Sequence, residues 1–235
     1  MVRMPMYSPL VVLAFLGACA GLVLMAVICL FGLVSRRFMV AKVAAGIAAT
    51  AVALYALLLF SFSLASQERT LLSGQYKYFC EVDCHIAYSV QSVTQERSLG
   101  SGSVVMNAQG VFYIVRLQTW FDPSTISAHR GNGPLAPSPR EVVVVDSNGH
   151  EYAPLPQAQQ ILGADANTTP LTTPLRPSES FLTDFVFDLP PDAPNPRLLV
   201  KDADPITAVF IGHEDSPLHK KIFFALTGNR SAYRD

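Results

Sequence analysis

Two cysteines and a histidine form the densest group of chemically reactive side chains in the sequence: Cys80, Cys84 and His85. Paired cysteines in an oxidising compartment usually form a disulfide. On a straight strand, residues four apart lie about 13 Å from each other, which is beyond the reach of a disulfide. A bridge between Cys80 and Cys84 therefore requires a turn at Glu81–Asp83. A disulfide closed across such a turn is our first interpretation.

Three other interpretations of the same group stay open. Thiolates and an imidazole are good ligands for copper or zinc, so the group is also a candidate metal site. The spacing C-x-x-x-C-H is one residue longer than the C-x-x-C-H motif that attaches haem covalently, and no axial ligand for a haem is evident. The last interpretation is a pair of free thiols without a role.

A second group of ionisable side chains lies in GHEDSPLHKK, near the end of the sequence. On a turn, His213 and His219 would converge with His85 on a metal ion. The competing interpretation, which we favour, is a solvated polar loop between two strands. The chain contains no G-x-S-x-G nucleophile motif and no glycine-rich phosphate-binding loop. We therefore expect that the protein is not an enzyme and has no cofactor, with copper or zinc as the alternative.

The elements that would position these groups begin with two uncharged apolar segments, residues 9–34 and 43–65. Each exceeds the roughly 20 residues that a helix needs to cross the hydrocarbon core, and backbone groups in lipid must be satisfied within the segment. The first segment is too long for the apolar region of a signal peptide, which spans about 7–15 residues. We predict a transmembrane helical hairpin over residues 1–66, with the lipid bilayer as a partner.

Basic residues predict the orientation of this hairpin. Arg36, Arg37 and Lys42 crowd the short connection between the two segments, which is typical of a cytoplasmic loop. Residues 67–235 would then form a domain on the extracytoplasmic side of a bacterial inner membrane.

Small residues recur at helical spacing in both segments. Gly17 and Gly21 form a G-x-x-x-G in the first, and Ala45, Ala49 and Ala53 form a stripe in the second. Small residues let helix backbones approach closely in lipid. The two stripes would face either each other or the helices of another protein.

The charge of the second part excludes one class of partner. Only four of the 17 basic residues precede residue 67, and all 18 acidic residues follow it, so residues 67–235 carry a net charge of −5. Nucleic-acid binding requires a basic surface that can neutralise phosphates. We therefore expect no nucleic acid as a partner.

Short runs with strand character fill residues 67–235. The clearest are GVFYIVRLQTWF and SFLTDFVFDL, which alternate between two faces, and REVVVVDSNGHEY, which has an Asn-Gly turn at Asn148–Gly149. YKYF, HIAYSVQSV, PRLLVKD, ITAVFIG and KKIFFALT complete about eight predicted strands. Residues 122–139 and 154–180 are predicted as long loops. Because no stretch has a helical period, we predict an all-β domain, either a sandwich or a barrel.

Part of this domain resembles a bacterial family. The hairpin Asp146-Ser-Asn-Gly149-His-Glu-Tyr152, followed by Val186-Phe187-Asp188-Leu189-Pro190, is similar to the immunoglobulin-like domains of uncharacterised bacterial lipoproteins and secreted antigens. In that family, D-x-x-G-x-x-Y precedes G-x-x-x-x-x-x-V-F-D-V-P, and Ser178 or Glu179 stands here near the usual Gly. The resemblance covers about residues 76–227. It implies an immunoglobulin-like sandwich used for binding or assembly.

The overall layout resembles cytochrome c oxidase subunit II, in which a two-helix hairpin precedes an outer β domain. That subunit binds a dinuclear copper centre through a C-x-x-x-C loop, and this chain has Cys80-Glu-Val-Asp-Cys84. The family's following His and Met are replaced here by Tyr88 and Gln91, and the loop lies at the start of the domain rather than near its end. The resemblance implies the topology of a respiratory accessory subunit, but not that copper centre.

These observations favour an interaction protein. The hairpin would hold the sandwich at the membrane, where the domain contacts another membrane or envelope protein. The alternative is a metal or redox module built on Cys80, Cys84 and His85, with His213 or His219.

Overall fold

The computed structural model describes all residues except 1–7, 80–82, 102–103, 163–166, 168 and 227–235. The chain forms two compact units. The hairpin unit comprises Pro5–Gln67 and Pro205–Lys220, and the β unit consists mainly of Glu68–Asp204 with the residues from Lys221 onward. The boundary predicted at residue 66 did not anticipate that residues 205–220 group with the hairpin.

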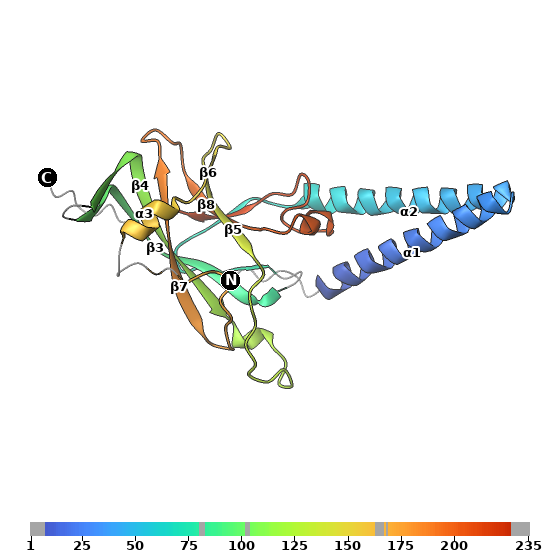
Figure 1. The fold of residues 1–235 in the computed structure, drawn as a ribbon, viewed down its shortest axis with the longest axis horizontal. Helices are drawn as coiled ribbons and strands as arrows, with labels where there is room; N and C mark the ends of the chain where they lie inside the picture. Colours follow the sequence, from blue (N-terminus) through green and yellow to red (C-terminus); the bar gives the residue numbers. More distant parts are fainter. Residues whose placement is uncertain (1–7, 80–82, 102–103, 163–166, 168, 227–235) are drawn as a thin grey trace. The chain divides into compact units, whose positions relative to one another are not determined.

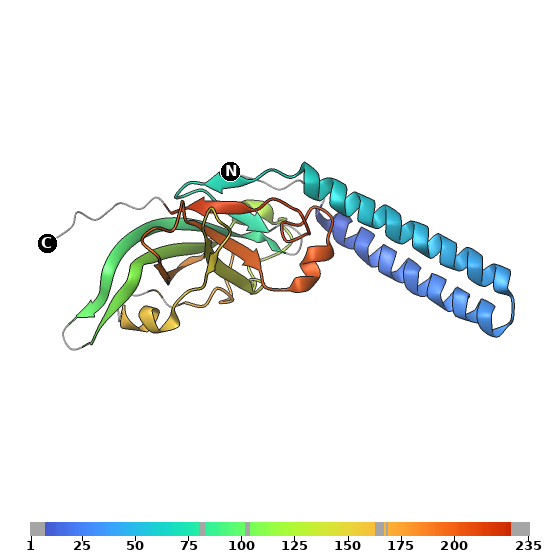
Figure 2. The same ribbon diagram turned by 90° about the horizontal axis from the view of Figure 1, so that it is seen from above.

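The hairpin consists of α1 (Ser8–Val34) and α2 (Phe38–Ala65), both long and apolar enough to cross a membrane. Figure 2 shows them as antiparallel neighbours. The second helix begins at Phe38, earlier than the predicted residue 43, and Lys42 lies inside it. Residues 38–41 are apolar, and the long stem of Lys42 lets its ammonium reach toward the end of the helix. The reversal takes place over Ser35–Arg37, where Arg36 has a φ of 57°.

The two helices approach most closely near this turn. A Cβ on Gly32 would lie 2.8 Å from the backbone nitrogen of Ala41, and Ala41 and Ala44 are buried. In contrast, a Cβ on Gly17 or Gly21 would meet nothing within 4 Å. The second stripe, Ala45, Ala49 and Ala53, is also exposed. The two stripes therefore do not face each other, and both lie open on the hairpin.

Residues 205–220, called here the 205–220 segment, complete the hairpin unit. The prediction of a strand over ITAVFIG was wrong, because this stretch forms the 3-10 helix η3 (Pro205–Val209) followed by turns. Proline favours the first turn of a helix, and Gly212 adopts a φ of 81° in the turns that follow. The backbone N–H of Lys220 donates to the Ser66 hydroxyl at 2.7 Å, so the end of the segment is fastened to the end of α2.

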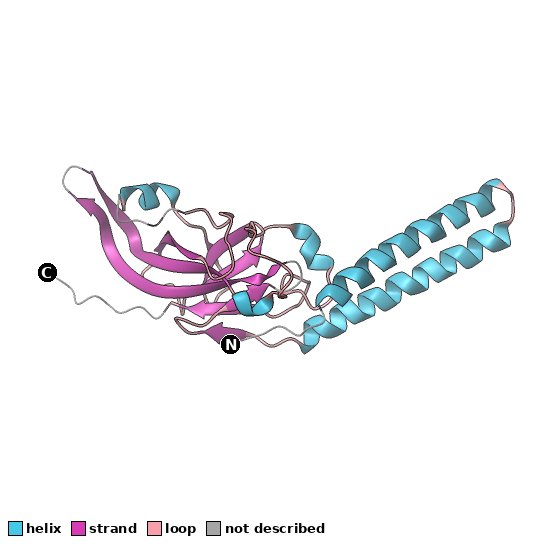
Figure 3. Cartoon of the chain, turned by 90° about the horizontal axis from the view of Figure 1, so that it is seen from below, coloured by secondary structure: helices cyan, strands magenta, loops and turns pink. Residues whose placement is uncertain are grey.

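The β unit is a sandwich of two sheets (Figures 1 and 3). The five-stranded sheet has the order β1-β9-β8-β5-β6, with β1 (Arg69–Leu71) parallel to β9 and the other neighbours antiparallel. Its remaining strands are β9 (Ile222–Ala225), β8 (Arg197–Asp202), β5 (Arg140–Val145) and β6 (Glu151–Tyr152). The antiparallel four-stranded sheet has the order β2-β3-β4-β7, formed by Lys77–Phe79, Asp83–Ser101, Val104–Phe121 and Ser180–Leu189. The predicted two-layer β domain is confirmed, with nine strands among the described residues.

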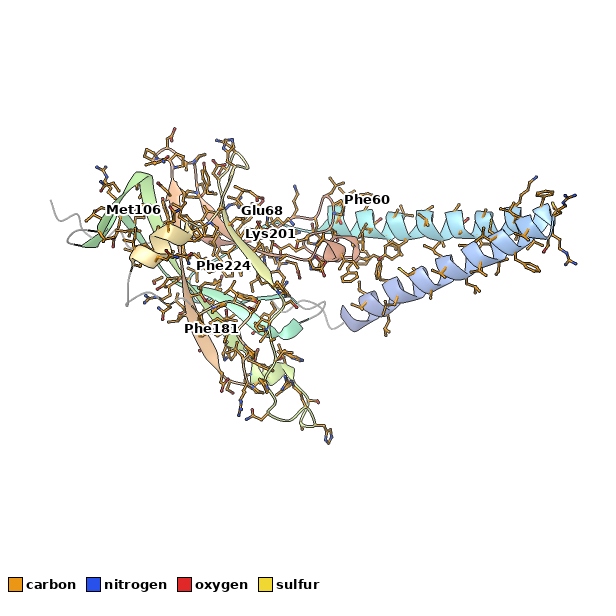
Figure 4. All side chains as sticks on the ribbon, viewed as in Figure 1. Phe60, Glu68, Met106, Phe181, Lys201 and Phe224 are labelled. Carbon is orange, nitrogen blue, oxygen red and sulfur yellow. The ribbon has the colours of Figure 1, made fainter. Side chains whose placement is uncertain are left out.

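Alternation along the strands builds the core between the sheets. Val115 and Leu117 of β4 and Phe187 of β7 are fully buried there, together with Leu198 and Phe224 from the opposite sheet. Phe224 is labelled in Figure 4. Val115 and Leu117 thus share one buried face of β4, in agreement with the alternation predicted for this run. Burying a side chain of this size contributes about 1.5–3 kcal/mol, so the two alternating runs supply much of the stability of the sandwich.

A short helix, α3 (Pro156–Ile161), covers the outer face of the four-stranded sheet. The prediction placed this stretch in a loop and no helix in the domain. Its six residues are too few to show a helical period, and Pro156 at its first turn looks like a loop signal although proline is favoured there. Ala158 of α3 is buried against a small second core formed with Leu99, Phe112 and Val186.

The predicted β5–β6 hairpin is confirmed, and one carboxylate organises it. Asp146 is buried and accepts hydrogen bonds from the backbone N–H groups of Asn148 (2.8 Å) and His150 (2.9 Å) and from the hydroxyl of Tyr152 (3.2 Å). Gly149 has a φ of 85°, which suits glycine. The D-x-x-G-x-x-Y pattern is therefore a turn motif in this protein.

Candidate functional site

Of the cysteine pair, Cys80 lies outside the described residues, and Cys84 is described only as a backbone position in β3. The antiparallel strands β2 and β3 bring Phe79 opposite Asp83, so the chain reverses direction between them. The disulfide, metal and haem interpretations of the cysteines all stay predictions.

His85 is the described member of the first group, and two contacts hold its ring. The ring stacks on Phe121 with centroids 5.7 Å apart, and its Nδ1 lies 2.8 Å from the Thr125 hydroxyl. That hydroxyl already donates its proton to the carbonyl of Asp122 at 2.7 Å. The Nδ1 of His85 is therefore the donor to this hydroxyl, and in the neutral imidazole the Nε2 is then the nitrogen with the lone pair.

His213 and His219 belong to the hairpin unit, whereas His85 belongs to the β unit. His213 is 1% exposed, and its Nδ1 accepts the N–H of Asp215 at 3.0 Å. His219 has its Nδ1 2.7 Å from the Lys220 carbonyl oxygen. Within the part of the chain that the structure describes, no three His, Cys, Asp or Glu side chains gather as metal ligands would.

The favoured interpretation of GHEDSPLHKK as a solvated loop was wrong for its first half. His213, Glu214 and Ser216 are each at most 3% exposed. The Ser216 hydroxyl donates to the Phe210 carbonyl at 2.7 Å, which folds the segment back on itself. The sequence alone does not reveal this burial, because His213 and Ser216 bond to backbone groups of the same segment.

A projecting ribbon is the most prominent exposed feature of the β unit. Its strands are residues 98–101 of β3 and 104–107 of β4, paired from Ser98–Asn107 to Ser101–Val104. The pairing of β4 with β7 stops at Val111–Leu189, so this ribbon extends past its neighbours (Figures 2 and 3). We call it the β-arm. Among the described strands, those of the β-arm pair only with each other.

The base of the β-arm is fixed to β7. The Asp188 carboxylate accepts the backbone N–H groups of Gln109 at 2.7 Å and Gly110 at 3.0 Å. A Cβ on Gly110 would lie 2.0 Å from the Leu189 carbonyl oxygen, so only glycine allows this close approach. The β-arm therefore leaves the sheet from a well-defined point.

One face of the β-arm packs on α3, and its tip is exposed. Leu99 is buried, and Met106, labelled in Figure 4, packs with it against the cluster around α3. Gly100 has a φ of 91°, and a Cβ there would lie 2.2 Å from the Val104 carbonyl oxygen. At the tip, Val104 and Val105 are 58% and 53% exposed. The β-arm is thus a supported ribbon that presents apolar side chains to its surroundings.

A carboxylate network joins β4 and β7 in the sheet that carries the β-arm. Asp184 is buried and receives the Arg116 guanidinium in two hydrogen bonds of 2.8 and 3.0 Å, and Asn167 donates to it from both its backbone and its side chain. Burial alone would raise the pKa of Asp184, but these partners outweigh it, so the pKa of Asp184 lies below its ordinary value. The pair spans β4 and β7 in direct register.

A shallow cleft of about 430 Å³ lies between α3 and residues 169–172. Its polar groups are amides and hydroxyls together with Arg140, and prolines and Phe185 supply apolar surface. Among the described residues, the lining consists of Pro139, Arg140, Pro156, Gln159, Gln160, Thr169, Pro170, Leu171, Thr172, Thr183 and Phe185. None of these residues is the carboxylate, imidazole or thiol that general acid–base or nucleophilic chemistry most often uses.

No family model matches the sequence, and no curated protein is similar to it at a significant level. Three solved structures have partial similarity. A conserved hypothetical protein from Bacillus anthracis is 15% identical, with a TM-score of 0.40, over 55% of this chain and 87% of that one. The yjhA protein from Bacillus subtilis is 10% identical, with a TM-score of 0.39, over 67% and 99%. An uncharacterised β-sandwich protein from Clostridium difficile 630 is 8% identical, with a TM-score of 0.36, over 69% and 96%.

Proposed function

We propose that this protein is a membrane-anchored interaction or assembly module, whose β-sandwich lies on the extracytoplasmic side of a bacterial inner membrane. The hairpin supplies the anchor, the sandwich has the immunoglobulin-like character that its hairpin motif suggests, and the β-arm contacts a membrane or envelope protein. The main observation behind the proposal is that the β-arm exposes an apolar tip, although its base and one face are held by β7 and α3.

The geometry of the β-arm favours binding to a protein. Natural proteins usually shorten, charge or cover the free edges of strands, because an open edge can pair with another chain. Here residues 98–101 and 104–107 pair only with each other among the described strands, and Val104 and Val105 stand exposed at the end. Support by α3 removes much of the ordering cost that a free loop would incur on binding. The β-arm therefore combines open edges with a preformed shape.

The open small-residue stripes of the hairpin support membership in a larger membrane complex. Gly17 and Gly21 on α1, and Ala45, Ala49 and Ala53 on α2, are exposed rather than packed between the two helices. In lipid, such stripes let a helix of another subunit approach closely. This supports the role of an accessory subunit, with contacts both within and outside the membrane.

Site-specific photocross-linking in living cells tests the proposal. A photoreactive amino acid at Val105 is expected to give one discrete adduct with a membrane or envelope protein. Leu72, which is 60% exposed in the same unit, is the matched control and should not give that adduct. Repeated absence of an adduct at both Val104 and Val105, with normal expression, would count against an interaction through the β-arm.

The second candidate function is a metal-binding or redox module that uses Cys80, Cys84 and His85. The hydrogen-bonded Nδ1 of His85 favours it, because ligating histidines usually have the other ring nitrogen held in this way. Metal content and intact mass of the full chain, purified in detergent, separate the candidates. Stoichiometric copper or zinc would favour the metal module, whereas a gain of about two daltons on reduction without metal would indicate a bridge.

A further inference from the structure

The 205–220 segment packs at one position along the two helices of the hairpin. The Tyr55 hydroxyl of α2 donates to the Val209 carbonyl at 2.7 Å, and the Phe210 ring meets Phe15 of α1 edge-on, with centroids 5.1 Å apart. Phe15 also lies 6.3 Å from the ring of Tyr55. An aromatic group shared by both helices therefore holds the segment against the hairpin.

The length of α2 relates this aromatic group to the bilayer. At about 1.5 Å per residue, Tyr55 lies about 27 Å along the helix from Arg37, which precedes α2. The hydrocarbon core of a bilayer is about 30 Å thick. If the arginines at the turn mark one surface of the membrane, Tyr55 and Val209 lie at the other. Aromatic rings are enriched at that depth because they are apolar with a polar edge.

The exposed side chains of the segment suit this location. Ile206, Val209 and Leu218 are 51%, 40% and 64% exposed. Leu218 also has a φ of 65°, a left-handed conformation that is unfavourable for leucine. In water, this leucine has both an exposed apolar side chain and an unfavourable backbone conformation. An apolar environment would remove the cost of exposing the side chain to water. Lys220 follows Leu218 by two residues and is exposed, so a cation lies close to this leucine along the chain.

We propose that the 205–220 segment is an interfacial element that lies in the headgroup region of the bilayer crossed by the hairpin. Ile206, Val209 and Leu218 reach the boundary of the acyl chains, and Lys220 contacts lipid phosphate. Apolar groups beside a cation give this combined attraction to a phospholipid surface. The inference rests on the membrane anchorage proposed above, and it adds a second site of lipid contact made by the chain between β8 and β9.

Depth-dependent fluorescence quenching tests this inference on the full chain in liposomes. Trp120 is the only tryptophan, so a Trp120→Phe background can carry one reporter at a time. The reporters are Leu218→Trp and Ile206→Trp in the segment, Leu24→Trp on α1 as the test of insertion, and Val105→Trp on the β-arm as the exposed apolar control. The quenchers are phospholipids brominated either near the headgroup or deep in the acyl chains, compared with the same lipids without bromine.

The proposal predicts loss of fluorescence for Leu218→Trp and Ile206→Trp in lipid brominated near the headgroup, with a smaller loss in deeply brominated lipid. Val105→Trp should lose less than either. If Leu24→Trp is quenched but neither segment reporter is quenched more than Val105→Trp, the interfacial element is refuted and the anchor stands. If Leu24→Trp is not quenched, the hairpin is not in the bilayer, and both proposals fail.

Discussion

The ammonium of Lys77 donates to the carbonyl oxygen of Val200 at 2.7 Å and to that of Ile222 at 3.0 Å. Lys77 belongs to the four-stranded sheet, and its two acceptors belong to β8 and β9 of the other. The lysine is 1% exposed, and its Nζ also lies 4.8 Å from the centroid of the Phe79 ring. One buried cation thus links the two layers of the sandwich through backbone carbonyls, with an aromatic face as a further partner.

Replacing this cation should destabilise the β unit. Lys77→Met keeps most of the apolar volume but leaves two buried carbonyls without their charged donor, which we expect to cost about 2–4 kcal/mol. Thermal unfolding followed by the fluorescence of Trp120, which lies in this unit, measures the effect. Lys201→Met is the matched control, because Lys201 is a surface lysine beside Glu141 and Glu151 and should change stability by less than about 1 kcal/mol. Equal effects of the two changes would refute the structural role of Lys77.

Lowering the pH should reduce the stability of the β unit, partly through protonation of Asp184. Its pKa is lowered when folded, so its contribution to stability is fully present above the unfolded value of about 3.9 and is lost as the pH falls through the folded value. Asp184→Asn should therefore lose less stability than the wild type between neutral pH and about pH 2. Unfolding curves at several pH values check this. Identical pH dependence in the two proteins would contradict it.

Asp146 should contribute to the same acid effect. Burial raises its pKa, but hydrogen bonds from His150, Asn148 and Tyr152 outweigh this and lower it. Asp146→Asn combined with Asp184→Asn should accordingly flatten the pH dependence more than either change alone. Additive flattening is expected because the two carboxylates lie in separate networks. If the double variant matches Asp184→Asn alone, Asp146 does not take part.

Gly100→Ala should disrupt the β-arm. The added Cβ would meet the Val104 carbonyl oxygen at 2.2 Å and the Ile161 side chain at 2.8 Å, at a φ of 91°. Gly74→Ala is the control, because Gly74 has a φ of 80° but open space around it, so it should incur only the conformational cost of about 1–2 kcal/mol. Hydrogen exchange should show loss of protection in residues 98–107 for Gly100→Ala alone. Unchanged protection there would mean that the β-arm does not depend on this glycine.

Leu218→Asn tests the backbone strain at residue 218. Asparagine tolerates a left-handed φ better than leucine, so we expect the purified protein in detergent to gain up to about 1 kcal/mol. Thermal unfolding of the hairpin unit, followed by helical circular dichroism, measures this gain. Leu72→Asn, at an exposed leucine with ordinary backbone, should stay within about 0.5 kcal/mol of the wild type. A loss of stability in Leu218→Asn would show that the leucine is held by contacts within the protein.

Periodicity decided which elements could be predicted from the sequence. The long apolar runs of α1 and α2 and the two faces of β4 and β7 repeat often enough to be recognised, and the Asn-Gly turn located the β5–β6 hairpin. In contrast, α3 is too short to show a period. The 205–220 segment resembled a strand because ITAVFIG is apolar and β-branched, but its placement depends on Tyr55 and Phe15, which lie far away along the chain.

The candidate site was harder to predict, because it also depends on contacts between residues far apart in the sequence. The open β4 edge of the β-arm depends on where the pairing of β7 stops, at Leu189, and strand ends are set by tertiary packing. The burial of Lys77 and His213 depends on acceptors and donors in the backbone, which leave no trace in residue type. Only the glycines at the β-arm, Gly100 and Gly110, were visible signals, because glycine within a strand often marks a close backbone approach.

Co-purification of native membrane partners with β-arm variants tests the central claim most directly. The full chain is extracted in mild detergent from its own cells, either as the wild type or with Val104→Lys and Val105→Lys together, and bound proteins are quantified by mass spectrometry. An interaction module that uses the β-arm should lose one specific membrane or envelope protein in the double variant and keep it in a Leu72→Lys control. Retention of every partner at wild-type amounts in the double variant would contradict the proposed role of the β-arm.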